Sequence, residues 1–253
     1  MKRLFVILIL LLPLNGPAQQ PMFQSENFPT GLLARWNLCG DTSATSGCAA
    51  SSSTTVYDSS ENGIIGTWSG TAAGSTGYYS AGHTGPWAGY FNGTNNAIAF
   101  GNMGLNFSNP WSACAWVNLR SLGTTPQVIL QVGTATSGES VQLLVNSTNG
   151  FYLDTWGPVS TLISHSVPST STWYDVCFVI NSTSTASIYV NGTAVVTAGT
   201  FNTSSVTGYS GNFIGNYGAV SGANTLIGSI NFVSIYNRAL SAGEIAAMAL
   251  SHN

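Results

Sequence analysis

The chain has 253 residues, of which 44% are hydrophobic and only 5% are charged. Five Lys and Arg stand against eight acidic residues, so the formal net charge is −3. Nucleic acids and anionic lipids are bound by clustered Lys and Arg, and this composition excludes such a cluster. Typical soluble domains are about 25% charged, so neutral polar groups must provide the solubility of this chain.

The first residues have the pattern of a secretory signal peptide. Lys2 and Arg3 precede an apolar stretch, and small residues follow, ending at Ala18. The apolar stretch is shorter than the roughly 20 residues that a spanning helix needs. We expect a signal peptide over 1–18 and one secreted domain over 19–253, exported to the extracellular space or the cell surface without membrane insertion after cleavage.

Strand patterns recur from Leu32 almost to the C-terminus. Each is a short run of alternating apolar and polar residues, bounded by Gly, Asn, Ser or Pro. In the first run, Leu32, Ala34, Trp36 and Leu38 share one face of an extended chain. This alternation predicts a strand with that face buried.

Two hairpins are predicted from Asn-Gly pairs. The pair at 149–150 follows an alternating run over 141–145, and the pair at 191–192 follows one over 186–190. Asn-Gly is the dipeptide that a tight type I′ turn prefers, because both central residues have positive φ. Each pair therefore indicates two neighbouring antiparallel strands.

One helix is predicted, at the C-terminal end. Ser241 and Glu244 have the spacing of a capping box, which predicts a helix over 242–250. Thr-, Ser- and Gly-rich stretches over 42–55 and 71–84 are predicted as long loops, because they lack a sustained apolar period. Many short strands with frequent turns and no αβ alternation favour an all-β sandwich.

Four cysteines in a secreted chain indicate disulfides. None of their spacings is the CxxC pair of a metal site. Three pairings are possible, and we favour Cys39–Cys48 as the staple of a short loop and Cys114–Cys177 as a bridge between two strands. The second bridge closes the longer loop, which the chain-entropy model values at about 4 kcal/mol.

Several segments in a fixed order carry a family resemblance. They lie at 31–36, 56–63, 90–94, 115–117, 173–178, 188–192 and 235–241, with Glu244 and Ile245 after the last, which is the most specific. Together they resemble the laminin-G-like jelly-roll domains of the concanavalin A-like lectin/glucanase superfamily. The resemblance implies a two-sheet antiparallel jelly-roll sandwich with one short C-terminal helix. It further implies that the first strand pairs with the last, and that Cys114 and Cys177 lie on neighbouring strands.

The resemblance also implies a structural calcium site. Members of the family hold the ion near the segment that matches 58–62, with a further acidic ligand just before the terminal Tyr-Asn-Arg segment. In this chain the matching ligands are Asp58, Asn62 and Asn231 together with backbone carbonyls. Fewer carboxylates weaken calcium binding. The alternative is that Asp58 and Asn62 cap a turn through their side chains and need no ion. No other cofactor is expected.

Some relatives on this fold are glycosidases whose catalytic carboxylates lie together in an E-x-D-x-x-E strand motif. Nothing in the chain matches that motif. Glycoside hydrolysis needs two carboxyl groups facing one bond, whereas Glu139, Asp154 and Asp175 are isolated in the sequence. We therefore expect a protein that is not an enzyme, with a glycoside hydrolase as the lesser alternative.

The predicted hairpin after residue 141 supplies the candidate ligand-binding site. Tyr152, Asp154 and Trp156 alternate onto one strand face, and Gln142 lies on the same face of the preceding strand. Aromatic rings stack on the apolar face of a sugar while polar neighbours fix its hydroxyl groups. The alternative is that these are outward-facing residues of a sandwich without a ligand.

The predicted function is that of a secreted, non-catalytic binding module that recognises a carbohydrate or another extracellular surface polymer. The alternative is a structural or adhesive cell-surface protein that acts through contacts with copies of itself or another protein. No nucleic-acid partner is expected, because the chain has too few basic residues.

Overall fold

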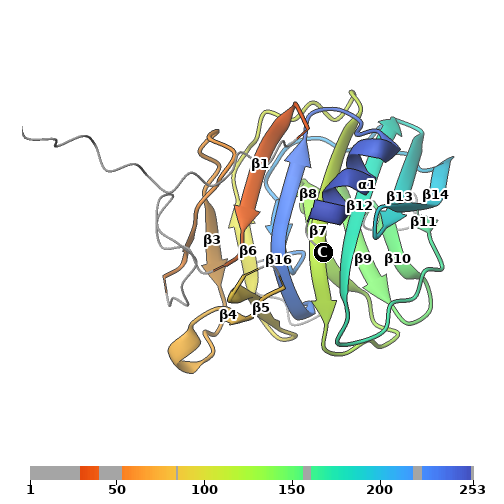
Figure 1. The fold of residues 1–253 in the computed structure, drawn as a ribbon. Helices are drawn as coiled ribbons and strands as arrows, with labels where there is room; N and C mark the ends of the chain where they lie inside the picture. The colour runs from red at the N-terminus through yellow and green to blue at the C-terminus, as the bar shows by residue number, and fades with distance from the viewer. Residues whose placement is uncertain (1–28, 40–52, 84, 156–160, 219–223, 252–253) are drawn as a thin grey trace, which may run out of the picture.

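Alternating apolar and polar residues build two antiparallel β-sheets that pack face to face (Figure 1). The computed structural model describes residues 29–39, 53–83, 85–155, 161–218 and 224–251. The predicted signal peptide lies outside these residues. In the first sheet the strand order is β14 (Thr193–Thr200), β13 (Thr185–Val190), β12 (Trp173–Ser182), β7 (Trp111–Leu119), β16 (Ile227–Tyr236), β5 (Trp87–Asn92) and β4 (Tyr79–Ala81), and β1 (Leu32–Asn37) also pairs with β16.

The second sheet completes the sandwich and confirms the predicted all-β fold class. Its strands are all paired antiparallel, as are those of the first sheet. One helix, α1 (Ala242–Ser251), follows β16. The strand order of the second sheet is β11 (Thr161–Ile163), β10 (Gly150–Asp154), β9 (Ser140–Asn146), β8 (Gln127–Gly133), β15 (Phe213–Ile214), β6 (Ala97–Phe100), β3 (Gly66–Ser69) and β2 (Thr55–Val56).

The main core lies between the two sheets. On β7, Ala113, Ala115 and Val117 are buried in it, so the alternation turns Cys114 and Trp116 to the outer face, the one directed away from the second sheet. Burial of each large apolar side chain contributes about 1.5–3 kcal/mol, which makes this layer the main source of stability.

The bridge between Cys114 and Cys177 forms as predicted. The two cysteines are directly opposite in the β7–β12 ladder, and their sulfur atoms are 2.08 Å apart. Cys39 is also disulfide-bonded, while its predicted partner Cys48 lies outside the described residues. The strand pairing implied by the resemblance is likewise confirmed, because β1 pairs with β16.

Both Asn-Gly pairs connect hairpin strands. β13 and β14 flank Asn191 and Gly192, whose φ angles of 51° and 76° are both positive, as a type I′ turn requires. β9 and β10 pair around Asn149 and Gly150, and Gly150 has a φ of 69°. These turns fix the register that places side chains on each face.

The capping box at the start of α1 is formed. The backbone N–H of Ser241 donates to Glu244 Oε2 at 2.8 Å, and the backbone N–H of Glu244 donates to Ser241 Oγ at 3.3 Å. Hydrogen bonds from Arg238, and secondarily from Ser241, lower the pKa of Glu244 to about 2. The helix packs Ile245 and Met248 against the outer face of the first sheet, over the disulfide (Figure 1).

Two sequence predictions were wrong in detail. A bulge between Leu32 and Ala34 shifts the register, so Leu32 packs against the outer cluster beneath α1 and Leu33 against the main core. The predicted loop over 71–84 contains β4, whose Tyr79 is buried against the main core. Three residues of strand are too few to produce a recognisable alternation.

The exposed edge strands are short or bulged. β14 is the longest edge strand in the described part of the chain, and it carries no charged residue or proline. Its pairing with β13 has two register shifts, and Ala198 has a φ of 46°. Bulges twist an edge away from a straight partner strand, which disfavours edge-to-edge self-association.

Candidate functional site

The hairpin site predicted from the sequence is assembled on the outer face of the second sheet. Gln142 and Asp154 are direct partners in the β9–β10 ladder, and Tyr152 lies on the same face. The structure adds Gln131 from β8, which is the register partner of Gln142. Trp156 lies outside the described residues.

Most of this face is buried, however. Tyr152 is 3% exposed and packs with Val128, Leu144 and part of Tyr217. Burial, with a smaller contribution from the Asp154 charge, raises the pKa of Tyr152 to about 12. A buried phenol ring offers no surface on which a sugar can stack.

Gln142 is also buried, at 5% exposure, and it takes part in a hydrogen-bond chain. Its Nε2 donates to Gln131 Oε1 at 2.5 Å, and Gln131 Nε2 donates to the carbonyl of Gly211 at 2.6 Å. Asp154 is partly exposed at the margin, where Thr161 Oγ1 donates to its Oδ2 at 3.2 Å. The centre of this face therefore acts in packing, and only its margin reaches solvent.

The carboxylate of Asp58, the predicted calcium ligand, organises a turn. Its Oδ1 accepts the backbone N–H groups of Arg35 at 2.9 Å and Ser60 at 2.8 Å. Its Oδ2 accepts Ser60 Oγ at 2.8 Å and the backbone N–H of Ile64 at 2.9 Å. Four donors occupy the oxygen atoms that a cation would need, so the turn-capping alternative describes this residue.

The two amides predicted to join Asp58 do not fit a cation either. Asn62 turns its Nδ2 toward the carbonyls of Leu32 and Leu33, at 3.1 and 3.0 Å, and therefore presents donors. Asn231 lies at a bulge of β16, where its Oδ1 accepts the backbone N–H of His83 at 2.9 Å. The described residues contain no group of three or more His, Cys, Asp or Glu side chains that would hold a metal.

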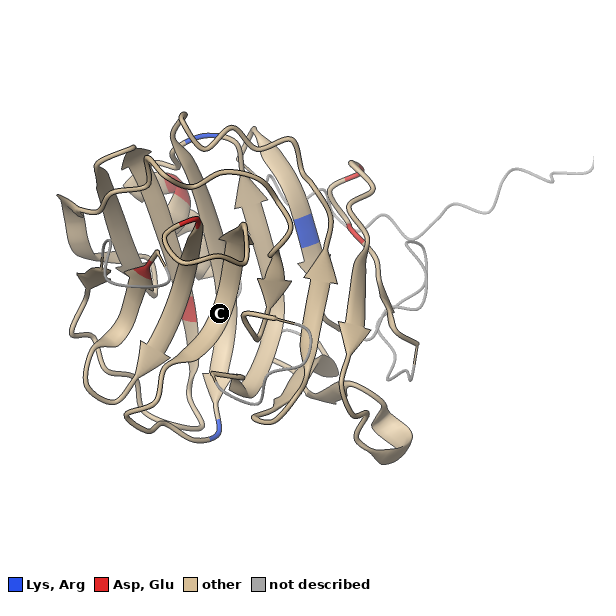
Figure 2. Cartoon of the chain, turned by 180° about the vertical axis from the view of Figure 1, so that it is seen from behind, with Lys and Arg blue, Asp and Glu red and all other residues tan. Residues whose placement is uncertain are grey.

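Two of the isolated carboxylates, Asp154 and Asp175, lie on different sheets. Asp154 lies on the outer face of the second sheet, whereas Asp175 lies on the outer face of the first sheet, on β12. Figure 2 shows acidic and basic residues placed singly along the described chain. Asp154 and Asp175 therefore do not face one bond in the way that glycoside hydrolysis requires.

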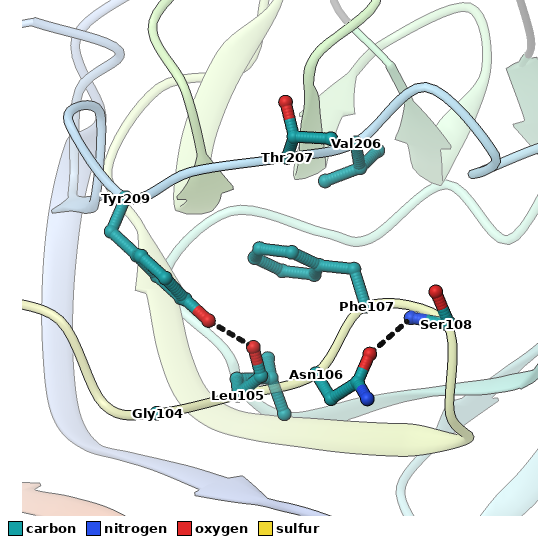
Figure 3. A pocket seen from close by; sticks show the side chains of 8 residues that line it. All are labelled: Gly104, Leu105, Asn106, Phe107, Ser108, Val206, Thr207 and Tyr209. Atoms are coloured by element: carbon teal, nitrogen blue, oxygen red, sulfur yellow. Dashed lines mark hydrogen bonds between the residues drawn. The ribbon is translucent and has the colours of Figure 1, made fainter.

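An accessible hollow lies instead at one end of the sandwich, and we call it the rim pocket (Figure 3). It is a shallow, open hollow of about 310 Å³ between the β6–β7 and β14–β15 connections. This volume is at the lower end of the roughly 300–1,000 Å³ range of small-molecule sites. The lining residues are Gly104, Leu105, Asn106, Phe107, Ser108, Val206, Thr207 and Tyr209.

Local hydrogen bonds shape the first wall of the rim pocket. The carboxamide oxygen of Asn106 accepts the backbone N–H of Ser108 at 3.0 Å. The backbone carbonyl of Asn106 accepts the backbone N–H of Asn109, also at 3.0 Å. The carboxamide oxygen of Asn102 accepts the backbone N–H of Gly104 at 2.7 Å. In these Asx turns the side-chain oxygen accepts a backbone N–H that has no strand partner after β6 ends. The turns leave Asn106 exposed.

Two aromatic rings join the walls of the rim pocket. The ring centroids of Phe107 and Tyr209 are 5.5 Å apart with a tilt of 31°, and the hydroxyl of Tyr209 donates to the carbonyl of Leu105 (Figure 3). Phe107 is 8% exposed, whereas Tyr209 is partly exposed and Asn106 and Thr207 are exposed. The pocket thus offers the partly exposed ring of Tyr209 beside hydroxyl and amide groups, and none of its lining residues is charged.

These pocket residues were not predicted from the sequence. Periodicity identifies strand faces, whereas the rim pocket is built from connections. The available signal was the pair of Asn-x-Gly and Asn-x-Ser turns over 102–108 beside an aromatic residue. That signal does not identify the facing wall, because Tyr209 is 104 positions from Leu105.

Comparison with solved structures agrees with the sandwich. The sialidase of Trypanosoma rangeli in complex with sialic acid has a TM-score of 0.61 at 16% identity, covering 88% of this chain and 33% of that chain. Domain 4 of AbnA, a GH43 extracellular arabinanase from Geobacillus stearothermophilus, in complex with arabinotriose has a TM-score of 0.63 at 21% identity, covering 86% and 98%. The binding domain of botulinum neurotoxin DC in complex with rat synaptotagmin II has a TM-score of 0.57 at 12% identity, covering 88% and 52%.

At these identities the likeness shows the fold alone, and the chain spans about a third of the length of the sialidase that it matches. No curated protein sequence matches the chain. The helix in the described part of the chain is too short to cross a membrane. The laminin G-like family model of the "Concanavalin A-like lectin/glucanases superfamily" matches residues 92–246, more than half of the chain. The chain therefore belongs to the laminin G-like family of the concanavalin A-like lectin/glucanases superfamily.

Proposed function

We propose that the chain is a secreted, non-catalytic module that binds a neutral saccharide in the rim pocket. The observation that carries this proposal is the partly exposed ring of Tyr209, which packs on Phe107 in a hollow of about 310 Å³ whose lining residues are uncharged. A sugar ring has an apolar face that stacks on an aromatic ring and a rim of hydroxyl groups that need neutral donors and acceptors. The exposed side chains of Asn106, Ser108 and Thr207 supply those partners.

A structural neighbour supports the ligand class. Domain 4 of the arabinanase, which is similar over 98% of its own length, is in complex with arabinotriose, a neutral oligosaccharide. The absence of charged side chains in the rim pocket also favours a neutral ligand, because an anionic sugar gains most from a guanidinium or ammonium partner.

The distribution of carboxylates supports a role without catalysis. Asp154 and Asp175 lie on different sheets, and none of the residues that line the rim pocket carries a carboxyl group. The disulfide between Cys114 and Cys177 supports secretion, since disulfides persist in oxidising compartments.

The test is a calorimetric titration of the purified protein with arabinotriose, xylotriose, cellotriose and maltotriose. We expect Tyr209→Ala to weaken binding of the preferred trisaccharide by about tenfold or more, which corresponds to about 1.4 kcal/mol. Thr207→Trp, which fills the rim pocket from an exposed position, should have the same effect without removing core contacts. Tyr57→Ala is the matched control, because Tyr57 is partly exposed and does not line the rim pocket.

Two results would count against the proposal. Binding that survives both Tyr209→Ala and Thr207→Trp would place the ligand elsewhere. Release of reducing ends from the trisaccharides, measured in the same samples, would replace a binding module with a hydrolase.

A further inference from the structure

A second hollow lies at the other end of the sandwich, and we call it the far pocket. It has a volume of about 270 Å³ and is built from three connections, which follow β5, follow β7 and precede β16. Its lining residues are Gly93, Ser121, Gly123, Thr125, Pro126, Gln127, Asn224, Thr225 and Ile227.

The floor of the far pocket is fixed by hydrogen bonds between these connections. Gln127 is 4% exposed, its Nε2 donates to the carbonyl of Ser121 at 2.9 Å, and its Oε1 accepts the backbone N–H of Ile227 at 2.8 Å. Thr225 is 3% exposed, and its hydroxyl donates to the carbonyl of Thr94 at 3.3 Å. Because both the nitrogen and the oxygen of the buried Gln127 carboxamide are hydrogen-bonded, the floor is rigid before a ligand binds.

The backbone around the far pocket is constrained as well. Gly93 has a φ of 79°, and a Cβ atom there would lie 2.5 Å from Ile227 Cγ1, so this lip of the pocket must be bare. Asn224, a non-glycine residue, has a φ of 65°, and its carbonyl accepts the backbone N–H of Val128 at 2.9 Å. Glycine and asparagine both tolerate the left-handed region, so these two residues let the backbone turn sharply at the edge of the pocket.

The groups that face solvent around this floor are neutral and polar. Within the described part of the chain, the side chains of Ser121, Thr125 and Asn224 make no hydrogen bond. Pro126 and Ile227 add an apolar patch beside them. This combination of hydroxyl groups, an amide and a small apolar surface suits a polyhydroxylated neutral ligand, the same class that suits the rim pocket.

The two pockets open at opposite ends of one strand. The rim pocket is lined by residues that precede β7, and the far pocket by residues that follow it. Nine extended residues at roughly 3.3 Å each separate them by about 30 Å. β7 runs the height of the sandwich (Figure 1). A single trisaccharide does not reach from one pocket to the other.

We propose that the far pocket is a second saccharide site, so that one chain cross-links two polysaccharide strands. The inference rests on the proposed function only in taking the same ligand class. With two sites at opposite ends, one molecule can bind two polymer chains at once. It can therefore cross-link them without pairing with a copy of itself.

The experiment counts ligands and measures cross-linking. Native mass spectrometry at saturating trisaccharide, over the panel of four named above, should show two bound molecules per chain. Soluble linear arabinan, arabinoxylan, mixed-linkage β-glucan and starch, the polymers related to that panel, are then tested for protein-induced turbidity. We expect turbidity with the polymer whose trisaccharide binds.

Gly123→Trp is the variant for the far pocket. An added Cβ at Gly123 has open space within 4 Å and the backbone is not left-handed, so a large side chain fills the pocket without strain. Gly85→Trp is the matched control, since Gly85 has the same open surroundings outside both pockets. Gly123→Trp and Tyr209→Ala should each leave one bound trisaccharide and abolish turbidity, whereas Gly85→Trp should leave both readouts unchanged.

The outcomes separate the two proposals. One bound trisaccharide that is lost in Tyr209→Ala and kept in Gly123→Trp overturns the far pocket and leaves the rim pocket intact. One bound trisaccharide that is lost only in Gly123→Trp overturns both the rim pocket and cross-linking. No binding by any trisaccharide and no turbidity with any polymer overturn both proposals.

Discussion

Replacing the buried carboxyl group of Asp175 should make the stability of this protein less sensitive to pH. Asp175 is 2% exposed on β12, opposite Trp116 in the β7–β12 ladder. Its Oδ2 makes no hydrogen bond within the described part of the chain. Its Oδ1 lies 3.7 Å from Cys177 Sγ, but a disulfide sulfur has no proton to donate. Burial of this carboxyl group without a donor raises its pKa from 3.8 to about 7.

The direction of the effect follows from proton linkage. A group whose pKa is higher in the folded chain than in the unfolded chain favours folding while it stays protonated. Its contribution is therefore complete below pH 3.8 and is lost as the pH rises to about 7. Three pH units at 1.36 kcal/mol each correspond to about 4 kcal/mol of the free energy of unfolding. Asp175→Asn removes the titration and keeps the shape of the side chain.

The assay is urea unfolding of the wild type and Asp175→Asn at pH 4 and pH 8. The free energy of unfolding of the variant, relative to the wild type, should rise by about 4 kcal/mol between the two values. Comparing the two proteins at each pH cancels all other titrations and any constant cost of the buried amide. Glu139→Gln is the control for the loss of one negative charge, because it removes a carboxylate from the β8–β9 turn. An equal difference between Asp175→Asn and wild type at both pH values would refute the reasoning.

Of four further predictions, two concern the helix, one the disulfide and one calcium. Ser241→Ala should lower the free energy of unfolding by about 1 kcal/mol, measured by urea unfolding, because it removes the side-chain cap of α1. The contribution of Glu244 should be present above about pH 4.5 and be lost as the pH falls toward 2, since its pKa is depressed to about 2, and circular dichroism at low pH would detect the loss of α1. Replacing Cys114 and Cys177 by Ala should cost about 4 kcal/mol in the same unfolding assay, and a cost below about 1 kcal/mol would contradict the chain-entropy account. Calcium and EDTA should leave Tm unchanged in calorimetry because N–H and O–H donors occupy the Asp58 carboxylate, whereas a calcium-dependent rise in Tm would restore the calcium hypothesis.

Sequence information was sufficient where the governing interactions are local or strictly periodic. Asn191-Gly192 determines its hairpin because both residues tolerate positive φ. Ser241 and Glu244 determine the start of α1 because their hydrogen bonds span one turn. The Cys114–Cys177 bridge was also predictable, since both residues lie on strands with an alternating pattern.

Prediction failed where the outcome depends on what another segment places above a face. Tyr152 and Gln142 were correctly placed on one face of a hairpin, yet their exposure is decided by Gln131 and by the segment around Gly211 and Tyr217. The bulge after Leu32 could not be predicted either. In the sequence Leu32 continues the alternating pattern of Ala34 and Trp36, although the bulge shifts its register.

The sequence by itself determined the class of the fold, its hairpins, its helix and the uncharged character of its surface. These follow from periodicity, turn chemistry and composition, which are properties of neighbouring residues. Only the tertiary structure decided that Asp58 caps a turn, that Asp175 is buried without a donor, and that two pockets form at opposite ends of β7. Each of these depends on connections far apart in the chain that pack together, and no short-range pattern encodes that packing.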